Sequence, residues 1–123
     1  MKKVPKDMHC LDFKRQRVFA LRSIKKGEVL ECSPVIPISA VEWVSVSKTV
    51  LRYCCYAWGE DYKGAAIALG YGSLFNCSRQ QPTACYVNHL KDLVIEFFAA
   101  RDIEKGEEIT VDRWKPDRDG DKD

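Results

Sequence analysis

The sequence predicts a single, mostly β domain with one short helix, and three observations carry this prediction. A pattern occurs twice, as VFALRSIKKGEVLE at residues 18–31 and as FFAARDIEKGEEITVD at residues 97–112. Most other apolar runs are short and are separated by Gly, Pro, Asn or Asp, which is typical of strands joined by turns. The chain has 123 residues, of which 46% are hydrophobic, enough for one compact core.

Each copy of the repeated pattern predicts a strand, a turn and a second strand. Gly27 and Gly106 lie at equivalent positions in the two turns, where glycine adopts a positive φ without steric cost. Ile24 and Ile103 are also equivalent, and we expect both to fill the core beneath their turns. Two copies are too few for a solenoid, so we expect two related corners of one β domain.

The rest of the chain supplies the helix and the domain limits. Residues 40–58 are the best helix candidate, because Ser39 and Glu42 have the spacing of a capping box. The segment PVIPIS, residues 34–39, has two prolines and is interpreted as an irregular edge or loop. Residues 85–100 predict two strands around a turn. We expect the domain to span residues 1–114 and residues 115–123 to form a charged, disordered tail.

Composition excludes several classes of protein. The six cysteines show no CxxC spacing, which predicts free thiols in a reducing compartment and a cytoplasmic location. His9 and Cys10 form one isolated pair, so we expect no metal site. The apolar runs are too short to span a membrane, and the N-terminus lacks the apolar stretch of a secretory signal.

Positive charge gathers at the N-terminus. Residues 1–26 contain nine Lys or Arg and two Asp. Such a face can be a solvated strand edge, which charged side chains protect from pairing with other chains. It can also meet nucleic acid or an acidic protein, so a nucleic-acid-binding module is one alternative function.

Three sequence blocks in a fixed order are together specific enough to indicate a family. They are RVFALRSIKKGEVLE, ALGYGSLFNCS and VIEFFAARDIEKGEEITVD. They resemble the short stand-alone SET-domain proteins, from about residue 15 to residue 113. The resemblance implies a SET-like fold of the β-clip type, with curled strands and a C-terminal pseudoknot. It also implies the family activity, which is methyl transfer from S-adenosylmethionine to a lysine amine of a protein.

The family's functional positions carry over residue by residue, and several are replaced. The Gly-x-Gly that approaches the cofactor is Arg15, Gln16 and Arg17 here, and the Asn-His-Ser motif is Asn76, Cys77 and Ser78. We interpret Cys77 as a small buried replacement for histidine. The position of the tyrosine that orients the amine is Arg113. Tyr71 matches an aromatic position near the lysine channel, and Trp114 stands where glycine is common.

These replacements predict a SET-like protein that has lost methyl transfer and acts by binding a protein or an anionic partner. Arginine is always protonated, and a fixed cation about 4 Å from the sulfonium costs roughly 4 kcal/mol at an effective dielectric near 20. If Arg15, Arg17 and Arg113 converge, they form an anion pocket. S-adenosylmethionine is expected as a cofactor only if the pocket is still competent.

The main alternative is an active, divergent protein-lysine N-methyltransferase. Asn76, Ser78 and Tyr71 are retained at family positions and favour it. In that case a different tyrosine takes over the role lost at position 113, and the chain offers four: Tyr53, Tyr56, Tyr62 and Tyr86.

Overall fold

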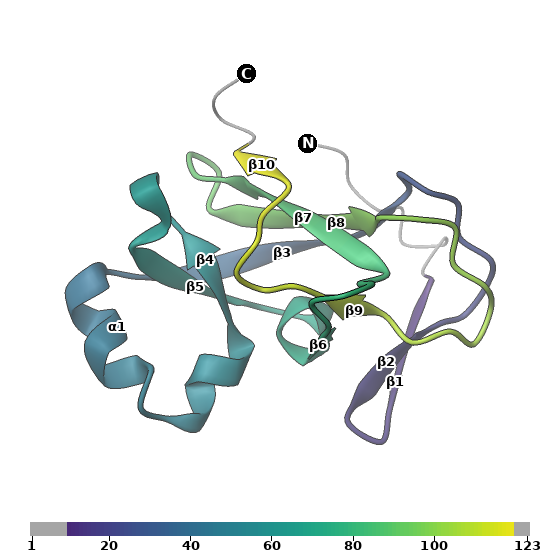
Figure 1. Ribbon diagram of the computed structural model, residues 1–123, viewed down its shortest axis with the longest axis horizontal. Coiled ribbons are helices and arrows are strands. Elements are labelled where there is room, and N and C mark those ends of the chain that lie inside the picture. The colour runs from purple at the N-terminus through teal and green to yellow at the C-terminus, as the bar shows by residue number, and fades with distance from the viewer. Residues whose placement is uncertain (1–9, 120–123) are drawn as a thin grey trace.

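The computed structural model describes residues 10–119, which form a mostly β domain (Figure 1). The strands are β1 (Leu11–Lys14), β2 (Arg17–Ala20), β3 (Val29–Ile38), β4 (Cys55–Trp58), β5 (Gly64–Ala68), β6 (Asn76–Cys77), β7 (Ala84–His89), β8 (Val94–Ala99), β9 (Thr110–Val111) and β10 (Arg118–Asp119). The helix α1 (Ala40–Val46) is accompanied by the 3₁₀ turns η2 (Val50–Cys54), η3 (Glu60–Tyr62) and η4 (Tyr71–Leu74). The predicted class, a mostly β fold with one short α-helix, is confirmed for this part of the chain.

The strands form one large sheet and two small ones. The large sheet has the order β10-β7-β8-β3-β5-β4, while β1 pairs with β2 and β6 pairs with β9. The interpretation of residues 34–39 as an irregular edge or loop is wrong, because Pro34 and Pro37 lie inside β3. β3 pairs with β8 as far as Pro34 and with β5 from Val35 onward. Each half therefore has one unpaired side, where a proline nitrogen needs no acceptor.

The repeated pattern forms two corners that pair with each other. Ile24 and Ile103 are both 1% exposed, and the backbone N–H of each donates to the carbonyl of the other, at 2.8 and 2.7 Å. Gly27 and Gly106 have φ values of 89° and 86°, as the turns were expected to need. The backbone N–H of each turn glycine also donates to an alanine carbonyl of the other copy: Gly27 N donates to Ala99 O, and Gly106 N donates to Ala20 O.

The helix is shorter than the sequence predicted. The capping box is present, since Ser39 N donates to Glu42 Oε1 and Glu42 N donates to Ser39 Oγ. However, α1 ends at Val46, and residues 55–58, expected to be helical, form β4. All four residues of β4 are buried, and β4 pairs with β5 along its length. Burial of a short apolar run in a sheet outweighs the weak helix propensity of its surroundings.

An aromatic cluster fills the core under the middle of the molecule. Tyr56 from β4, Tyr86 from β7, Phe97 from β8 and Phe75 before β6 are all fully buried. The ring of Phe97 lies 5.2 Å from Tyr56, 5.1 Å from Phe75 and 6.0 Å from Tyr86, between centroids. The Tyr56–Phe97 and Phe75–Phe97 pairs are edge-to-face, an arrangement that adds about 0.5–1.5 kcal/mol each beyond burial.

The C-terminal segment between β9 and β10, residues 112–117, passes over this aromatic cluster and is called the C-terminal crossing below. β9 runs parallel to β6, and beyond it the carbonyl of Arg113 accepts hydrogen bonds from Ala57 N of β4 and Tyr86 Oη of β7. In Figure 1 this segment runs between the β4–β5 lobe and β7 before reaching β10. The crossing corresponds to the C-terminal pseudoknot that the resemblance implies.

β10 lies within the segment that was expected to be a disordered tail. Arg118 and Asp119 pair in parallel with Val87 and Asn88 of β7, whose open edge offers backbone partners whatever the side chains. Residues 120–123 lie outside the described residues, as do residues 1–9, which hold Lys2, Lys3 and Lys6 of the basic N-terminal segment. The domain limit at residue 114 stays a prediction.

Candidate functional site

Arg113 is a buried cation at the centre of the site. Its side chain comes from the C-terminal crossing, and the residue is 6% exposed. Nη2 donates to the carbonyls of Ser73, at 3.2 Å, and of Phe75. The guanidinium carbon lies 4.8 Å from the centre of the Tyr56 ring. Carbonyl oxygens and an aromatic face attract cations, so this pocket is a cation site that Arg113 itself occupies.

The site holds Arg113 without a countercharge. Among residues 10–119, no ion pair to Arg113 is formed, and Nη1 is buried without a hydrogen-bond partner. Removal of a charge from water is costly when no opposite charge compensates it. The two carbonyls and the Tyr56 ring are therefore what offsets that cost.

Tyr56 lies against the Arg113 guanidinium, and its hydroxyl already forms a hydrogen bond. It donates to the carbonyl of Gly72 at 2.6 Å. Burial raises the pKa of Tyr56 above its usual range, and the Arg113 charge opposes that rise. Tyr86 is similarly buried and donates to the carbonyl of Arg113. Tyr53 and Tyr62 are 70% and 44% exposed, so neither lies in this buried pocket.

Arg15 and Arg17 face a different hollow. β1 and β2 form a hairpin whose two-residue turn, Arg15 and Gln16, has positive φ at both positions. A hollow of about 460 Å³ beside this hairpin is lined by Lys14, Arg15, Arg17 and Phe19. Arg113 is not among the lining residues and points into the core instead. The three arginines therefore do not converge, and the expected anion pocket built from Arg15, Arg17 and Arg113 is wrong.

The second family motif lies on the short strand β6. Asn76 is exposed and its Nδ2 donates to Glu108 Oε2 at 2.6 Å. Cys77 is exposed, so its interpretation as a buried replacement for histidine is wrong, since β6 is a two-residue strand paired on one side. Ser78 is half-buried, and its backbone N–H donates to Val111 O. The backbone of Glu108 forms an isolated antiparallel β-bridge with Phe19 of β2. The Asn76 motif therefore lies near the β1–β2 hairpin.

Glu31 holds the loop that supplies the pocket carbonyls, and sequence reasoning missed it. Its carboxylate accepts from the backbone N–H groups of Tyr71 and Gly72, at 3.0 and 2.7 Å, and from Ser33 Oγ at 2.7 Å. A Cβ on Gly72 would lie 2.7 Å from both Ser33 Oγ and the Phe97 ring. The Gly-Tyr-Gly spacing was visible in the sequence, but its carboxylate partner lies 40 residues earlier in the chain.

The two expected channel residues lie in different segments, Tyr71 in η4 and Trp114 between β9 and β10. Tyr71 packs against the main core from η4. Trp114 is 37% exposed, and its ring centroid lies 5.3 Å from that of Trp43 on α1. Trp114 therefore packs the C-terminal crossing against helix α1.

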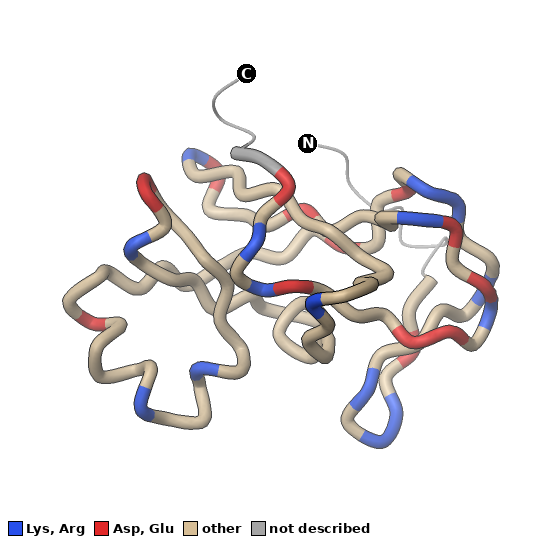
Figure 2. The backbone as a smooth tube through the Cα atoms, in the orientation of Figure 1, with Lys and Arg blue, Asp and Glu red and all other residues tan. Residues whose placement is uncertain are grey.

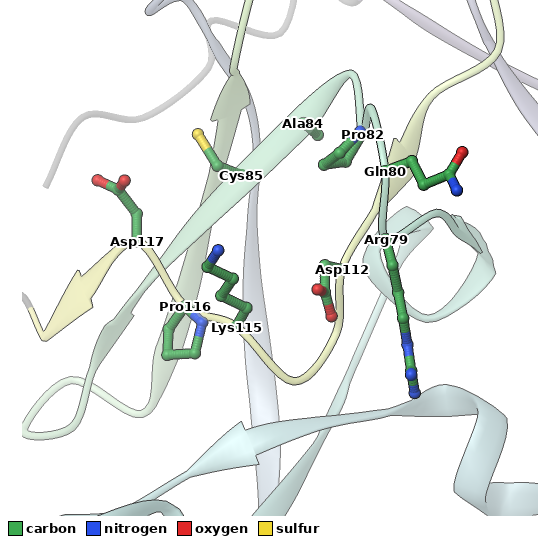
Figure 3. A pocket seen from close by; sticks show the side chains of 9 residues that line it. All are labelled: Arg79, Gln80, Pro82, Ala84, Cys85, Asp112, Lys115, Pro116 and Asp117. Atoms are coloured by element: carbon green, nitrogen blue, oxygen red, sulfur yellow. The ribbon is translucent and has the colours of Figure 1, made fainter.

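A second hollow is lined by residues of the C-terminal crossing together with residues 79–85 (Figure 3). It has a volume of about 300 Å³ and contains both acidic and basic side chains. Figure 3 shows Asp112 and Arg79 on one side, with Cys85 and Asp117 on the other. Burial raises the pKa of the Cys85 thiol to about 12, and Asp117 adds to that rise, so the thiol is a poor nucleophile.

Metal binding and membrane crossing have no support in residues 10–119. No group of three or more His, Cys, Asp or Glu side chains is placed to hold a metal ion there. No helix in the same range is long and apolar enough to cross a membrane.

Comparisons with known proteins agree on one family. The SET domain family profile matches residues 16–112. A histone-lysine N-methyltransferase of Schizosaccharomyces pombe, specific for H3 lysine-37, is 32% identical over 108 residues, which cover 87% of this chain and 71% of the relative.

Solved structures show the same fold. A candidate histone methyltransferase of Plasmodium falciparum superposes with a TM-score of 0.59 at 25% identity, covering 83% of this chain and 89% of that one. CpSET8 from Cryptosporidium gives a TM-score of 0.65 at 19% identity, covering 91% and 61%. The family profile spans most of the chain, and the relative's identity extends over nearly all of it. The chain therefore belongs to the SET-domain family.

Proposed function

We propose that this SET-family protein binds a protein partner without transferring a methyl group to it. The observation that carries the proposal is the Arg113 guanidinium, which fills a carbonyl-lined cation site at the position where the family places its tyrosine. A lysine amine and a positively charged sulfonium would have to react beside this fixed charge. Like charges in a buried site repel strongly, so the reaction is disfavoured.

The residues at the family's cofactor positions do not fit S-adenosylmethionine. Arg15 and Arg17 place side chains and charge where the family has glycine backbone. Asn76 is bonded to Glu108, and Cys77 cannot reproduce the donor and acceptor pattern of histidine. A solved SET structure, the Chaetomium thermophilum Polycomb complex with a TM-score of 0.58, contains S-adenosylmethionine. That neighbour is 19% identical and supports the fold alone.

The second candidate function is protein-lysine methyl transfer. The comparisons support it more directly than they support a loss of activity, since the S. pombe relative is a histone-lysine N-methyltransferase. Tyr71, Asn76 and Ser78 keep family residue types. This function requires another tyrosine hydroxyl in place of the one lost at position 113, and Tyr56 and Tyr86 would have to give up their present hydrogen bonds to supply it. It also requires the Arg113 charge to leave the face of the Tyr56 ring.

A calorimetric titration separates the two functions. We expect the full chain to bind neither S-adenosylmethionine nor S-adenosylhomocysteine at millimolar concentration, and to transfer no labelled methyl group to a histone H3 peptide containing lysine-37. A variant with R15G, R17G, C77H and R113Y restores the family residues and is expected to gain cofactor binding. Micromolar binding by the unmodified chain together with methyl transfer would establish the second function and reject the first.

We also propose a compartment and a kind of partner for this protein. All six cysteines are free thiols in the structure, which favours a reducing compartment and a cytoplasmic location. A protein is the favoured partner because the S. pombe relative acts on a protein, histone H3.

A further inference from the structure

The hairpin of β1 and β2 has one apolar face and one charged face. Leu11, Val18 and Ala20 are buried in the core. Side chains alternate along a strand, so Lys14 and Arg17, which pair across the hairpin, lie on the opposite face together with Phe19. This second face lines the hollow of about 460 Å³. A hollow of this size suits a small organic ligand rather than a single ion.

The lining has positive charge without a carboxylate partner. Lys14, Arg15 and Arg17 form no ion pair with any residue that the structure describes, whereas Arg22 and Arg101 both do. Lys14 Nζ instead lies 5.3 Å from the centre of the Phe19 ring. Asp12 and Glu108 both neighbour Phe19, through the hairpin register and an isolated β-bridge, but neither forms an ion pair with these three cations. The tip of the hairpin is accordingly coloured blue in Figure 2.

Arg15 has an unfavourable backbone conformation in the hairpin turn. Arg15 and Gln16 have φ values of 54° and 63°, in the left-handed region that a two-residue hairpin turn of this kind requires. Asn and Gly adopt this region most readily, so Arg15 stores strain of order 1 kcal/mol. Strain of this type concentrates where a side chain serves a ligand.

We propose that this hollow binds a phosphate-bearing ligand of mononucleotide size. Arg15, Arg17 and Lys14 contact the phosphates, because guanidinium groups form paired hydrogen bonds to phosphate oxygens. Phe19 supplies the aromatic surface for the base. The ligand is an anion, unlike the sulfonium cofactor of the family, and the proposal does not depend on Arg113 or on the proposed function.

The test is calorimetric titration of the full chain at about 0.1 M salt with ATP, tripolyphosphate and adenosine. We expect ATP to bind about tenfold tighter than tripolyphosphate, and adenosine not to bind measurably. R15N removes one guanidinium while suiting the left-handed turn, so it should raise the melting temperature and weaken ATP binding about tenfold. R17Q should weaken binding similarly, and the exposed control R52Q should leave it unchanged.

Three results would overturn the proposal. One is ATP binding by R15N as tight as that of the unmodified chain. A second is equal binding of ATP and adenosine, which would leave the phosphates without a role. A third is a single-stranded oligonucleotide that displaces ATP at far lower concentration, which would assign the face to extended nucleic acid. The single variant R113Y, which changes the residue that carries the proposed function, is expected to bind ATP as the unmodified chain does, because Arg113 does not line the hollow.

Discussion

At the scale of single residues, the identity of residue 113 decides what the site can do. A lysine has the same charge as arginine but offers a compact point charge instead of a planar fork. In Arg113 the single Nη2 donates to the carbonyls of both Ser73 and Phe75, while the planar guanidinium lies over the Tyr56 ring, and a lysine has no planar group to place there. The interaction therefore depends on the shape of the cation as well as on its sign.

We expect R113K to lower the free energy of unfolding by about 1.5–3 kcal/mol, the range for losing a hydrogen bond to a charged group. Denaturant unfolding with fluorescence detection measures it. The control R101K alters an exposed ion pair and should cost less than about 0.5 kcal/mol. Equal stability of R113K and the unmodified chain would show that the guanidinium does not hold the crossing in place.

At the scale of elements, the two repeated corners carry the same polar bonds. Arg22 pairs with Glu28 at 2.9 Å, and Arg101 pairs with Glu107 at 2.6 Å. The hydrogen bond from Arg22, and then the backbone N–H of Lys25, lower the pKa of Glu28. Arg101 and the N–H of Glu104 lower the pKa of Glu107 in the same way. Each carboxylate therefore stabilises the fold above its unfolded pKa, and that stability is lost as the pH falls through its lower folded pKa.

E28Q and E107Q should consequently cost nearly equal amounts, each about 0.5 kcal/mol at pH 7, because both pairs are solvent-screened. Both variants should lose less stability than the unmodified chain between pH 7 and pH 3. Thermal unfolding at a series of pH values checks this, with E60Q, an exposed glutamate in η3, as the control. A cost confined to one of the two corners would contradict the equivalence of the repeats.

The same scale shows where sequence reasoning succeeds and where it fails. The corners at Gly27 and Gly106 and the cap at Ser39 were predictable, because each depends on bonds within a few residues or on an internal repeat. The strand assignments of Pro37 and of residues 55–58 were not, because they depend on pairing with β5. The role of Arg113 was predicted in position only, since its partners Tyr56, Ser73 and Phe75 come together through the crossing.

At the scale of the whole molecule, the six thiols differ in exposure, so their labelling rates can measure local opening of the fold. Cys77 is exposed on β6, while Cys10 and Cys55 are buried. Burial raises the pKa of Cys55 to about 11 and that of Cys85 to about 12. Since the thiolate is the reactive form, these two carry less than about 1% of it at pH 8.

We therefore expect iodoacetamide at pH 8 to label Cys77 first and Cys85 slowly, because so little of Cys85 is thiolate. The buried Cys10 and Cys55 should be labelled only at the rate at which the fold opens. Mass spectrometry of labelled peptides over time measures each site. C77S should remove the fast phase, and C85S should leave it intact. Early labelling of Cys55 would place the opening at β4, and with it the Ala57 bond that holds the C-terminal crossing. Labelling that follows the expected order would show that this crossing stays closed while the edge strand β6 remains open to solvent.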